Sequence, residues 1–234
     1  MQNTLYDKTV DENSINTGFQ MFEKRVSGMF LGEILRQSLQ SLIKQSSLFN
    51  ARSSAALDKK YGIDTASMST IATDTSPHLD KVREIIVKDF GIPSPSLDDC
   101  RAVKVVSDAI ARRSARLAAC AVSGVCDFSG RFASATEGRP VDVGADGSLV
   151  EFYPQYVDMC LEAIDEILGR GASKRIRIGL AKDGSGVGAA LYRSPVSPPL
   201  RSLFLLPVPT VFCANGLVVL CKRRSKRRQG LLSR

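Results

Sequence analysis

A polar turn near the start of the chain leads directly into two predicted helices. The turn is built on Asn16 and Gly18, residue types that accept tight backbone geometry. Glu23 lies in the first predicted helix, and the small residues Ser27 and Gly28 mark its joint with the second. The second helix carries one apolar stripe at helical spacing, formed by Leu31, Ile34, Leu35, Leu39, Leu42 and Ile43. Residues 19–45 are therefore predicted to form two helices that follow a turn able to aim one carboxylate at a polar ligand.

Further helices are predicted from their start and stop signals. A short helix follows Asp64, and the next is expected to begin at Ser76 and Pro77 and to end at Gly91. Ser96 with Asp99 forms a near capping box for a long helix over residues 97–127. This helix is rich in small residues, which suit close packing against a neighbour. An amphipathic helix is expected over residues 154–168.

Three strands are expected, at residues 141–145, 148–152 and 175–181. The first two would form a hairpin over residues 139–153, with Asp146 and Gly147 as its turn. A glycine-rich turn at residues 182–191 would then enter a helix. The pattern predicts a helix-rich α/β protein with a short sheet, which has few strands for its size.

The chain has a net charge of +8, but the basic residues are unevenly placed. From Ser194 onward there are eight Lys and Arg and no acid, which leaves 24 bases and 24 acids in the rest. The charge therefore gives no reason to expect a nucleic-acid partner for the main body. Five of the ten prolines fall within residues 195–209. We expect residues 1–193 to form one domain and residues 194–234 to be a Pro-rich and then basic tail outside the fold.

Cysteine usage and the amino-terminal segment indicate a cytoplasmic protein. The six cysteines include no Cys-x-x-Cys pair, and His78 is the only histidine, so we expect no metal site. Residues 1–11 have no apolar core of a signal peptide. The apolar stretch at residues 202–221 is interrupted by Pro207 and Pro209, which argues against a membrane span.

Glu23, Asn16 and Gln20 are the candidate binding residues around the first turn. A sugar or another polyol presents neighbouring hydroxyls, and one carboxylate can accept two of them in charge-assisted hydrogen bonds. The alternative is that Glu23 is an ordinary solvated acid on a helix, which is the usual role of a glutamate. The residues alone leave both interpretations open.

Two glycine-containing turns are the remaining candidates. Residues 143–148 could let an adenine ring or a phosphate oxygen approach the backbone, or could be a plain Asp-Gly hairpin. Residues 184–188 lie at a predicted helix start, where free N–H groups favour anions, but they lack the P-loop pattern. His78 is interpreted as a surface residue because it has no partner for a triad or a metal site.

The order and spacing of these segments resemble the hexokinase family, and most closely its fungal glucokinases. The resemblance covers about residues 3–191. It is carried by residues 11–24, 27–33, 65–74, 110–119, 143–148 and 183–191. The resemblance implies an actin-like ATPase (ribonuclease H-like) fold, here an incomplete large domain. It also implies transfer of the γ-phosphoryl group of Mg-ATP to the 6-hydroxyl of glucose.

The resemblance also implies roles for individual residues. Glu23, with Gln20 and Asn16 beside it, would bind the hydroxyls of glucose or another hexose. The residues implied at the ATP are Gly28, Met29, Thr65, Ser69, Asp146, Gly147, Ser148 and Phe152. No catalytic or metal-binding residue is implied within this chain.

The chain departs from the family pattern in what lies before its first turn. The family's catalytic base is an Asp in an Asn-Asp segment well upstream of this turn, and only ten residues precede Asp11 here. We therefore expect a carboxy-terminal fragment without the base, and a tail that reflects a gene-model artefact. The alternatives are a non-catalytic module that binds nucleotide or hexose, and a fragment without a function of its own.

Overall fold

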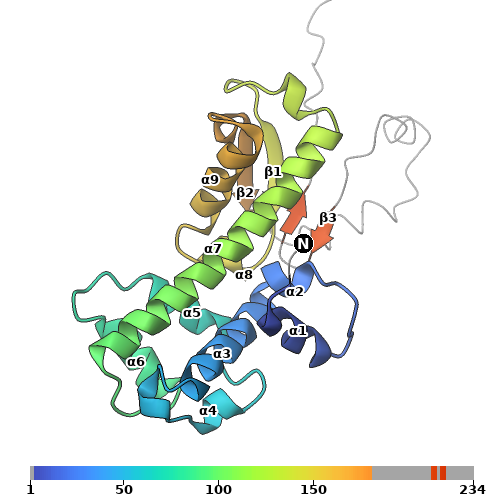
Figure 1. The fold of residues 1–234 in the computed structure, drawn as a ribbon. Coiled ribbons are helices and arrows are strands. Elements are labelled where there is room, and N and C mark those ends of the chain that lie inside the picture. Colours follow the sequence, from blue (N-terminus) through green and yellow to red (C-terminus); the bar gives the residue numbers. More distant parts are fainter. Residues whose placement is uncertain (1–2, 181–211, 215–216, 220–234) are drawn as a thin grey trace, which may run out of the picture.

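The computed structural model describes residues 3–180, 212–214 and 217–219, and one long helix, α7, organises them (Figure 1). Helices α1 to α6 gather around the first half of α7, and α9 with the strands β1 and β2 lies along the second half. The helices are α1 (Leu5–Glu12), α2 (Glu23–Val26), α3 (Gly28–Lys44), α4 (Ala55–Asp58), α5 (Thr65–Ala72), α6 (Asp80–Lys88), α7 (Leu97–Phe128), α8 (Ser148–Phe152) and α9 (Tyr156–Leu168). Short 3₁₀ turns are η1 (Phe49–Ala51), η2 (Phe132–Ser134) and η3 (Ser173–Arg175).

Helix α7 begins as the sequence predicts, with a complete capping box. The Ser96 hydroxyl accepts from the Asp99 N–H at 3.1 Å, and the Asp99 carboxylate accepts from the Ser96 N–H at 2.9 Å. Asp99 also accepts from the Phe49 N–H at 2.8 Å, which ties η1 to the start of α7. The buried face of α7 consists largely of small side chains, among them Ala111, Ala115 and Ala119. Because they are small, α9 packs close against α7.

The main apolar core lies between α3, α5 and α7, and the predicted stripe of α3 fills it. Leu31, Leu35 and Leu39 are fully buried. Gly32 lets α3 approach the segment before α5, because a Cβ at this position would lie 2.4 Å from the Ile63 carbonyl oxygen. A bulkier residue could not occupy position 32 without moving backbone.

The predicted hairpin over residues 139–153 is wrong. β1 (Val141–Ala145) pairs in parallel with β2 (Ile176–Leu180), and residues 148–152 form helix α8 instead of a strand. A parallel pair needs a crossover connection, which α8 and α9 supply. The Asp-Gly turn signal misled the prediction: Gly147 has φ +131°, but it leads the chain from β1 into a helix that buries Leu149.

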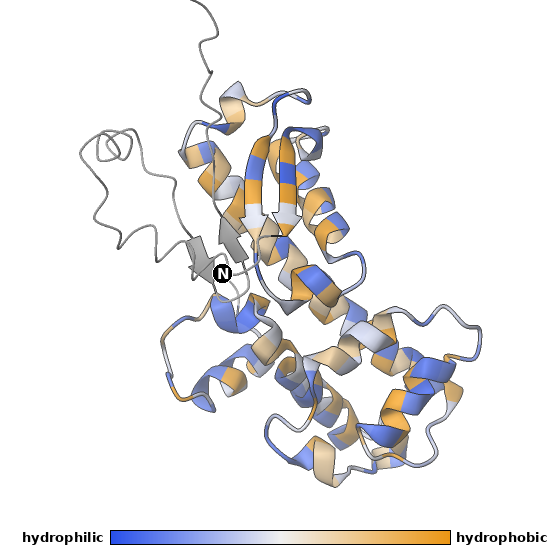
Figure 2. Cartoon of the chain, turned by 180° about the vertical axis from the view of Figure 1, so that it is seen from behind, coloured by the Kyte–Doolittle hydropathy of each residue, from blue (hydrophilic) through white to orange (hydrophobic). Residues whose placement is uncertain are grey.

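The two strands alternate between apolar and polar residues (Figure 2). In β1 the apolar residues Val141, Val143 and Ala145 are buried, whereas Ile178 of β2 is half-buried and Leu180 is exposed. Two further strands, β3 (Phe212–Ala214) and β4 (Leu217–Val219), pair with each other in antiparallel fashion, and β4 lies near β1. The rest of the predicted tail and the glycine-rich segment at residues 182–191 lie outside the described residues.

Two other helices differ from or extend the predictions. Helix α6 begins at Asp80, four residues after Ser76, because a turn comes first: Leu79 at φ +53° is the N-cap, and the Ser76 hydroxyl accepts from the Asp80 N–H at 3.1 Å. Helix α1, capped by Thr4 and Asp7, is not predicted by the sequence pattern because its apolar residues are few.

Among the helices of the described residues, none combines the length and the apolar content that a membrane span requires.

Candidate functional site

The turn before α2 is organised by the Asp11 carboxylate, which lies at the end of α1. It accepts from the Gly18 N–H at 3.1 Å and from the Lys24 ammonium at 2.7 Å. Lys24 also donates to the Asn16 carbonyl at 2.8 Å, so one lysine closes the turn onto both Asp11 and Asn16. The hydrogen bond from Lys24 lowers the pKa of the Asp11 carboxyl below its ordinary value, so Asp11 is ionised at neutral pH. The turn is thus braced by a charged pair.

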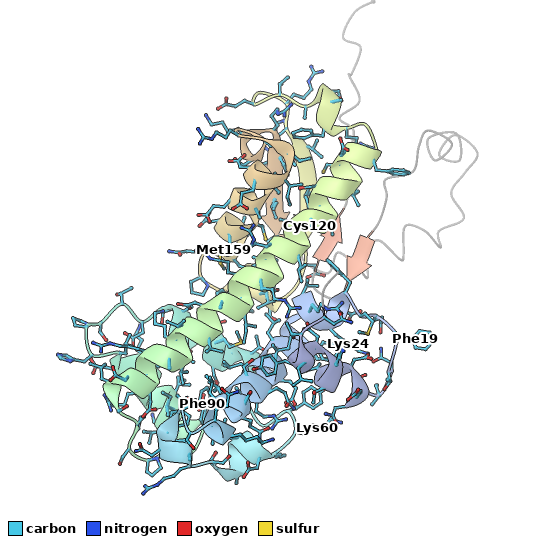
Figure 3. The ribbon with its side chains drawn as sticks, viewed as in Figure 1. Phe19, Lys24, Lys60, Phe90, Cys120 and Met159 are labelled. Atoms are coloured by element: carbon cyan, nitrogen blue, oxygen red, sulfur yellow. The ribbon has the colours of Figure 1, made fainter. Side chains whose placement is uncertain are left out.

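Asn16 and Gln20 lie on the open side of this turn. The Asn16 amide donates to the Gln20 side-chain oxygen at 2.6 Å, and Gln20 is exposed. Phe19, between them in sequence, points away from the body of the protein, whereas Lys24 lies against it (Figure 3). Two amides are therefore presented at the surface, next to the start of α2.

Glu23 is the first residue of α2 and is buried, with 8% of its surface exposed. Among the residues that the structure describes, no N–H or cationic group is within hydrogen-bonding or ion-pairing distance of its carboxylate. The other buried acids nearby are paired: Asp7 with Arg113, Asp11 with Lys24, and Glu33 with Arg36. The buried side-chain polar atoms without a hydrogen-bond partner in the described part are Arg25 Nε, Ser107 Oγ and Ser123 Oγ, so the oxygens of the Glu23 carboxylate keep access to solvent although the residue is largely buried. Glu23 is thus the acid in this part of the fold that is open to a donor from a ligand.

The rest of α2 is held in place by a buried ion cluster. Arg113 of α7 donates to both oxygens of Asp7, at 2.9 and 2.7 Å, and the Arg25 Nε lies 3.8 Å from the same carboxylate. Arg25 also donates to the Met21 carbonyl at 2.7 Å. Because Asp7 belongs to α1, Arg25 to α2 and Arg113 to α7, the cluster fixes α2 relative to both neighbours. Glu23 therefore lies on a helix that is fixed to α1 and α7.

A second group of predicted residues meets where α3, α5 and α8 begin. The Thr65 hydroxyl donates to the Gly28 carbonyl and accepts from the Gly32 N–H at 2.8 Å. A Cβ on Gly28 would lie 3.1 Å from the Ser148 hydroxyl and 3.4 Å from the Leu149 side chain. The structure thus brings Gly28, Thr65 and Ser148 together from positions far apart in the sequence. Side chains cap part of the first turns of α3 and α5, whereas α8 has no side-chain cap and presents free backbone N–H groups, which favour anions such as phosphate.

The remaining predicted residues surround this junction without entering these contacts. Asp146 and Gly147 are half-buried and connect β1 to α8, and Ser69 is half-buried one turn after Thr65 on α5. Met29 and Phe152 are strongly exposed, at 71% and 66%. They offer apolar surface beside the junction.

Sequence reasoning missed the residues that support the site. Asp11 and Lys24 belong to the segment at residues 11–24, but nothing in their spacing indicates that they pair across 13 positions. Asp7 and Arg113 are separated by 106 positions, and no local pattern could have joined them. His78 is exposed, as predicted. In the described part of the chain, no group of three or more His, Cys, Asp or Glu residues could hold a metal ion.

Comparison with known proteins identifies relatives over most of the chain. Residues 1–194 match the family model described as Hexokinase. A glucokinase from Aspergillus niger is 40% identical over 203 residues, which cover 82% of this chain and 40% of that protein. Hexokinase-7 from Oryza sativa subsp. japonica is 39% identical over 199 residues, covering 85% of this chain and 42% of that protein.

The fold is similar to that of solved hexokinases. The structure of hexokinase from Schistosoma mansoni complexed with glucose matches with a TM-score of 0.70 and 29% sequence identity. The match covers 80% of this chain and 40% of that one. The present chain therefore spans about two fifths of the length of the relatives that it matches.

Proposed function

The chain belongs to the hexokinase family, and from this we propose that it forms part of the hexose and nucleotide sites of an ATP-dependent hexose 6-phosphotransferase. The reaction transfers the γ-phosphoryl group of Mg-ATP to the 6-hydroxyl of glucose or another hexose. The observation that carries the proposal is Glu23, a residue that is 8% exposed and held on a braced helix, and whose carboxylate has no partner among the described residues. The glucose present in the Schistosoma mansoni hexokinase structure supports a hexose as the ligand.

On the hexose side, Glu23 accepts hydrogen bonds from two neighbouring hydroxyls of the sugar. Each is a charge-assisted bond, which is stronger than a bond between neutral groups. Asn16 and Gln20 add donors and acceptors at the mouth of the site once the 2.6 Å bond between their amides opens. The hydroxyls of a pyranose supply donors to a carboxylate that has none among the described residues.

On the nucleotide side, the junction of Gly28, Thr65 and Ser148 lies against the ATP. The absence of a side chain at Gly28 keeps the approach to the Ser148 hydroxyl open. Asp146 and Gly147 lie against the adenosine. Met29, Ser69 and Phe152 complete the surface, with the exposed Phe152 ring available for an apolar contact. Mg²⁺ enters with the phosphates of ATP, and we assign no residue of this chain to it.

The catalytic base that the family resemblance implies is not among these residues. The family resemblance places it in an Asn-Asp segment, and the 234 residues contain no Asn-Asp pair. Phosphoryl transfer depends on positioning, on charge stabilisation and on a base that orients the acceptor hydroxyl. We therefore propose that these 234 residues, by themselves, bind hexose but do not turn it over. A cytosolic location fits Cys100, Cys120 and Cys160 of the described part, which are free thiols.

The proposal is tested by titrating the ¹⁵N-labelled chain with glucose. We expect the largest shift changes at Asn16, Gln20 and Glu23, and we expect Glu23→Gln to abolish them. Glu12→Gln is the matched control, because Glu12 is an exposed acid on the neighbouring helix α1. Equal glucose binding by wild type and Glu23→Gln would contradict the proposal.

Two further assays separate the alternatives. A coupled assay for glucose 6-phosphate should show no turnover above background with the isolated chain, and robust turnover would refute the missing base. Calorimetry with ATP should show weak or undetectable binding, since this chain matches only about 40% of its relatives. A micromolar dissociation constant, about −8 kcal/mol, would instead favour a complete nucleotide site.

A further inference from the structure

One buried hydroxyl in the middle of α7 joins the two halves of the proposed site. Ser114 is fully buried, and its oxygen lies 3.1 Å from the Val26 carbonyl and 2.7 Å from the Tyr156 hydroxyl. A carbonyl only accepts, so the single Ser114 hydrogen goes to Val26. The Tyr156 hydroxyl must then donate to Ser114. The result is a directed chain of hydrogen bonds from Tyr156 through Ser114 to Val26.

The Val26 end of this chain fixes the joint between α2 and α3. Helix α2 ends at Val26, because Ser27 adopts an extended conformation with ψ 137°. A carbonyl at a helix end lacks an intrahelical donor, and Ser114 supplies one from a different helix. Glu23 lies three residues before this carbonyl and Gly28 lies two residues after it. The joint therefore carries the proposed hexose ligand on one side and a proposed nucleotide contact on the other.

The Tyr156 end fixes the start of α9. Tyr156 is the first residue of α9 and follows α8, which bears Ser148 and Phe152. Burial raises the pKa of the Tyr156 phenol, so the hydroxyl stays protonated and remains a donor throughout the physiological range. Hydrogen bonds in such a chain polarise and strengthen one another.

We infer that Ser114 is a positioning residue, which sets the α2–α3 joint so that Glu23 and Gly28 keep their places relative to α8. This inference rests on the proposed function for its consequence, but the geometry that it describes can be measured without any ligand. Ser114 touches neither sugar nor nucleotide and acts through the Val26 carbonyl.

The test compares three variants of the full 234-residue chain. Ser114→Ala leaves both the Val26 carbonyl and the Tyr156 hydroxyl buried without partners. Tyr156→Phe removes only the donor to Ser114, which still donates to Val26. Ser123→Ala is the matched control, because Ser123 is a serine of the same helix that is 1% exposed and whose hydroxyl has no partner in the described part.

The first measurement is amide hydrogen exchange at the joint. It is read at the Ser27 N–H, which donates to the Glu23 backbone carbonyl, and at the Phe30 N–H, which donates to the Ser27 backbone carbonyl. We expect exchange at these two amides to accelerate about tenfold in Ser114→Ala, beyond any change at the centre of α3. Tyr156→Phe should accelerate it less, and Ser123→Ala should leave it unchanged. Equal rates in Ser114→Ala and Ser123→Ala would overturn the inference.

The second measurement is the dissociation constant for glucose. We expect it to rise about tenfold in Ser114→Ala and to stay at the wild-type value in Ser123→Ala. Faster exchange with an unchanged glucose constant would show that Ser114 is structural only, and would overturn its positioning role. If wild type shows no Glu23-dependent glucose binding, the proposed function fails, and the exchange rates alone decide whether Ser114 sets the joint.

Discussion

Replacing Asp7 by Asn should destabilise the protein strongly, because Asp7 anchors three helices. Its side chain is 2% exposed and accepts from Arg113 at 2.9 and 2.7 Å, and from the N–H and hydroxyl of Thr4, both at 2.8 Å. Arg25, whose side chain is 6% exposed, lies 3.8 Å away. Asn cannot accept the fork of two Arg113 donors, and it leaves two guanidinium groups facing a neutral amide.

The size of the loss follows from how well each cation can return to water. Breaking a buried ion pair by removing one partner costs about 3–5 kcal/mol. Arg113 is 30% exposed and recovers part of its hydration, whereas Arg25 cannot. We therefore expect a loss toward the lower end, about 3 kcal/mol of unfolding free energy. Asp98→Asn is the matched control, since Asp98 and its partner Arg101 are 88% and 59% exposed, and the loss of this surface pair and of a charge in the first turn of α7 should cost less than about 1 kcal/mol.

The pH dependence of unfolding gives the prediction a second readout. Burial by itself would raise the pKa of Asp7, but the hydrogen bonds from Arg113 and Thr4 lower it below the ordinary value of 3.8. Below pH 3.8 the unfolded state then binds the proton first, so acid removes the stability that Asp7 contributes at higher pH. Urea unfolding followed by circular dichroism should therefore show a flatter acid limb for Asp7→Asn. A loss no greater than that of Asp98→Asn, with an unchanged acid limb, would refute the reasoning.

Three other predictions concern packing, capping and thiol reactivity. Gly32→Ala should cost about 3 kcal/mol in urea unfolding, because its Cβ would lie 2.4 Å from a backbone oxygen, whereas Gly124→Ala, with nothing within 4 Å, should gain up to about 1 kcal/mol. An unchanged unfolding free energy in Gly32→Ala would mean that α3 packs less closely than described. Ser96→Ala should lower the thermal unfolding free energy by about 1 kcal/mol through loss of the α7 cap, and an unchanged midpoint would argue against that cap. Iodoacetamide mapping should label the exposed Cys120 first and leave Cys160 unmodified in the native state, since burial raises the pKa of the Cys160 thiol to about 12; rapid labelling of Cys160 would contradict its burial.

The helices could be predicted where local signals and periodicity agree. Helix α7 begins and ends within one residue of its predicted bounds, because a capping box and a long face of small residues mark it. The stretch at residues 148–152 could not be assigned from its pattern, because a five-residue run with two apolar faces suits a strand or a helix. Only the parallel pairing of β1 with β2, a long-range feature, decides that the intervening chain must cross over.

The candidate site is also predictable only where its signals are local in the sequence. The turn at Asn16 and Gly18 and the acid Glu23 are visible as a local motif. The contacts that support them are not visible in the sequence. Asp7 and Arg113 are 106 positions apart, and Val26 and Ser114 are 88 positions apart. The hexokinase resemblance named Gly28, Thr65 and Ser148 together, but their physical contact appears only in the folded chain.

The most direct test of the central claim is activity in a complete enzyme. A glucokinase from Aspergillus niger in which residues 1–194 of this chain replace the matching segment should form glucose 6-phosphate in a coupled assay. Glu23→Gln in that protein should lower kcat/KM about 100-fold, or about 2.7 kcal/mol, because Gln keeps one acceptor oxygen but loses the charge and the second acceptor, while Glu12→Gln should not change it. Full activity of the Glu23→Gln protein would contradict the assignment of Glu23 to the hexose.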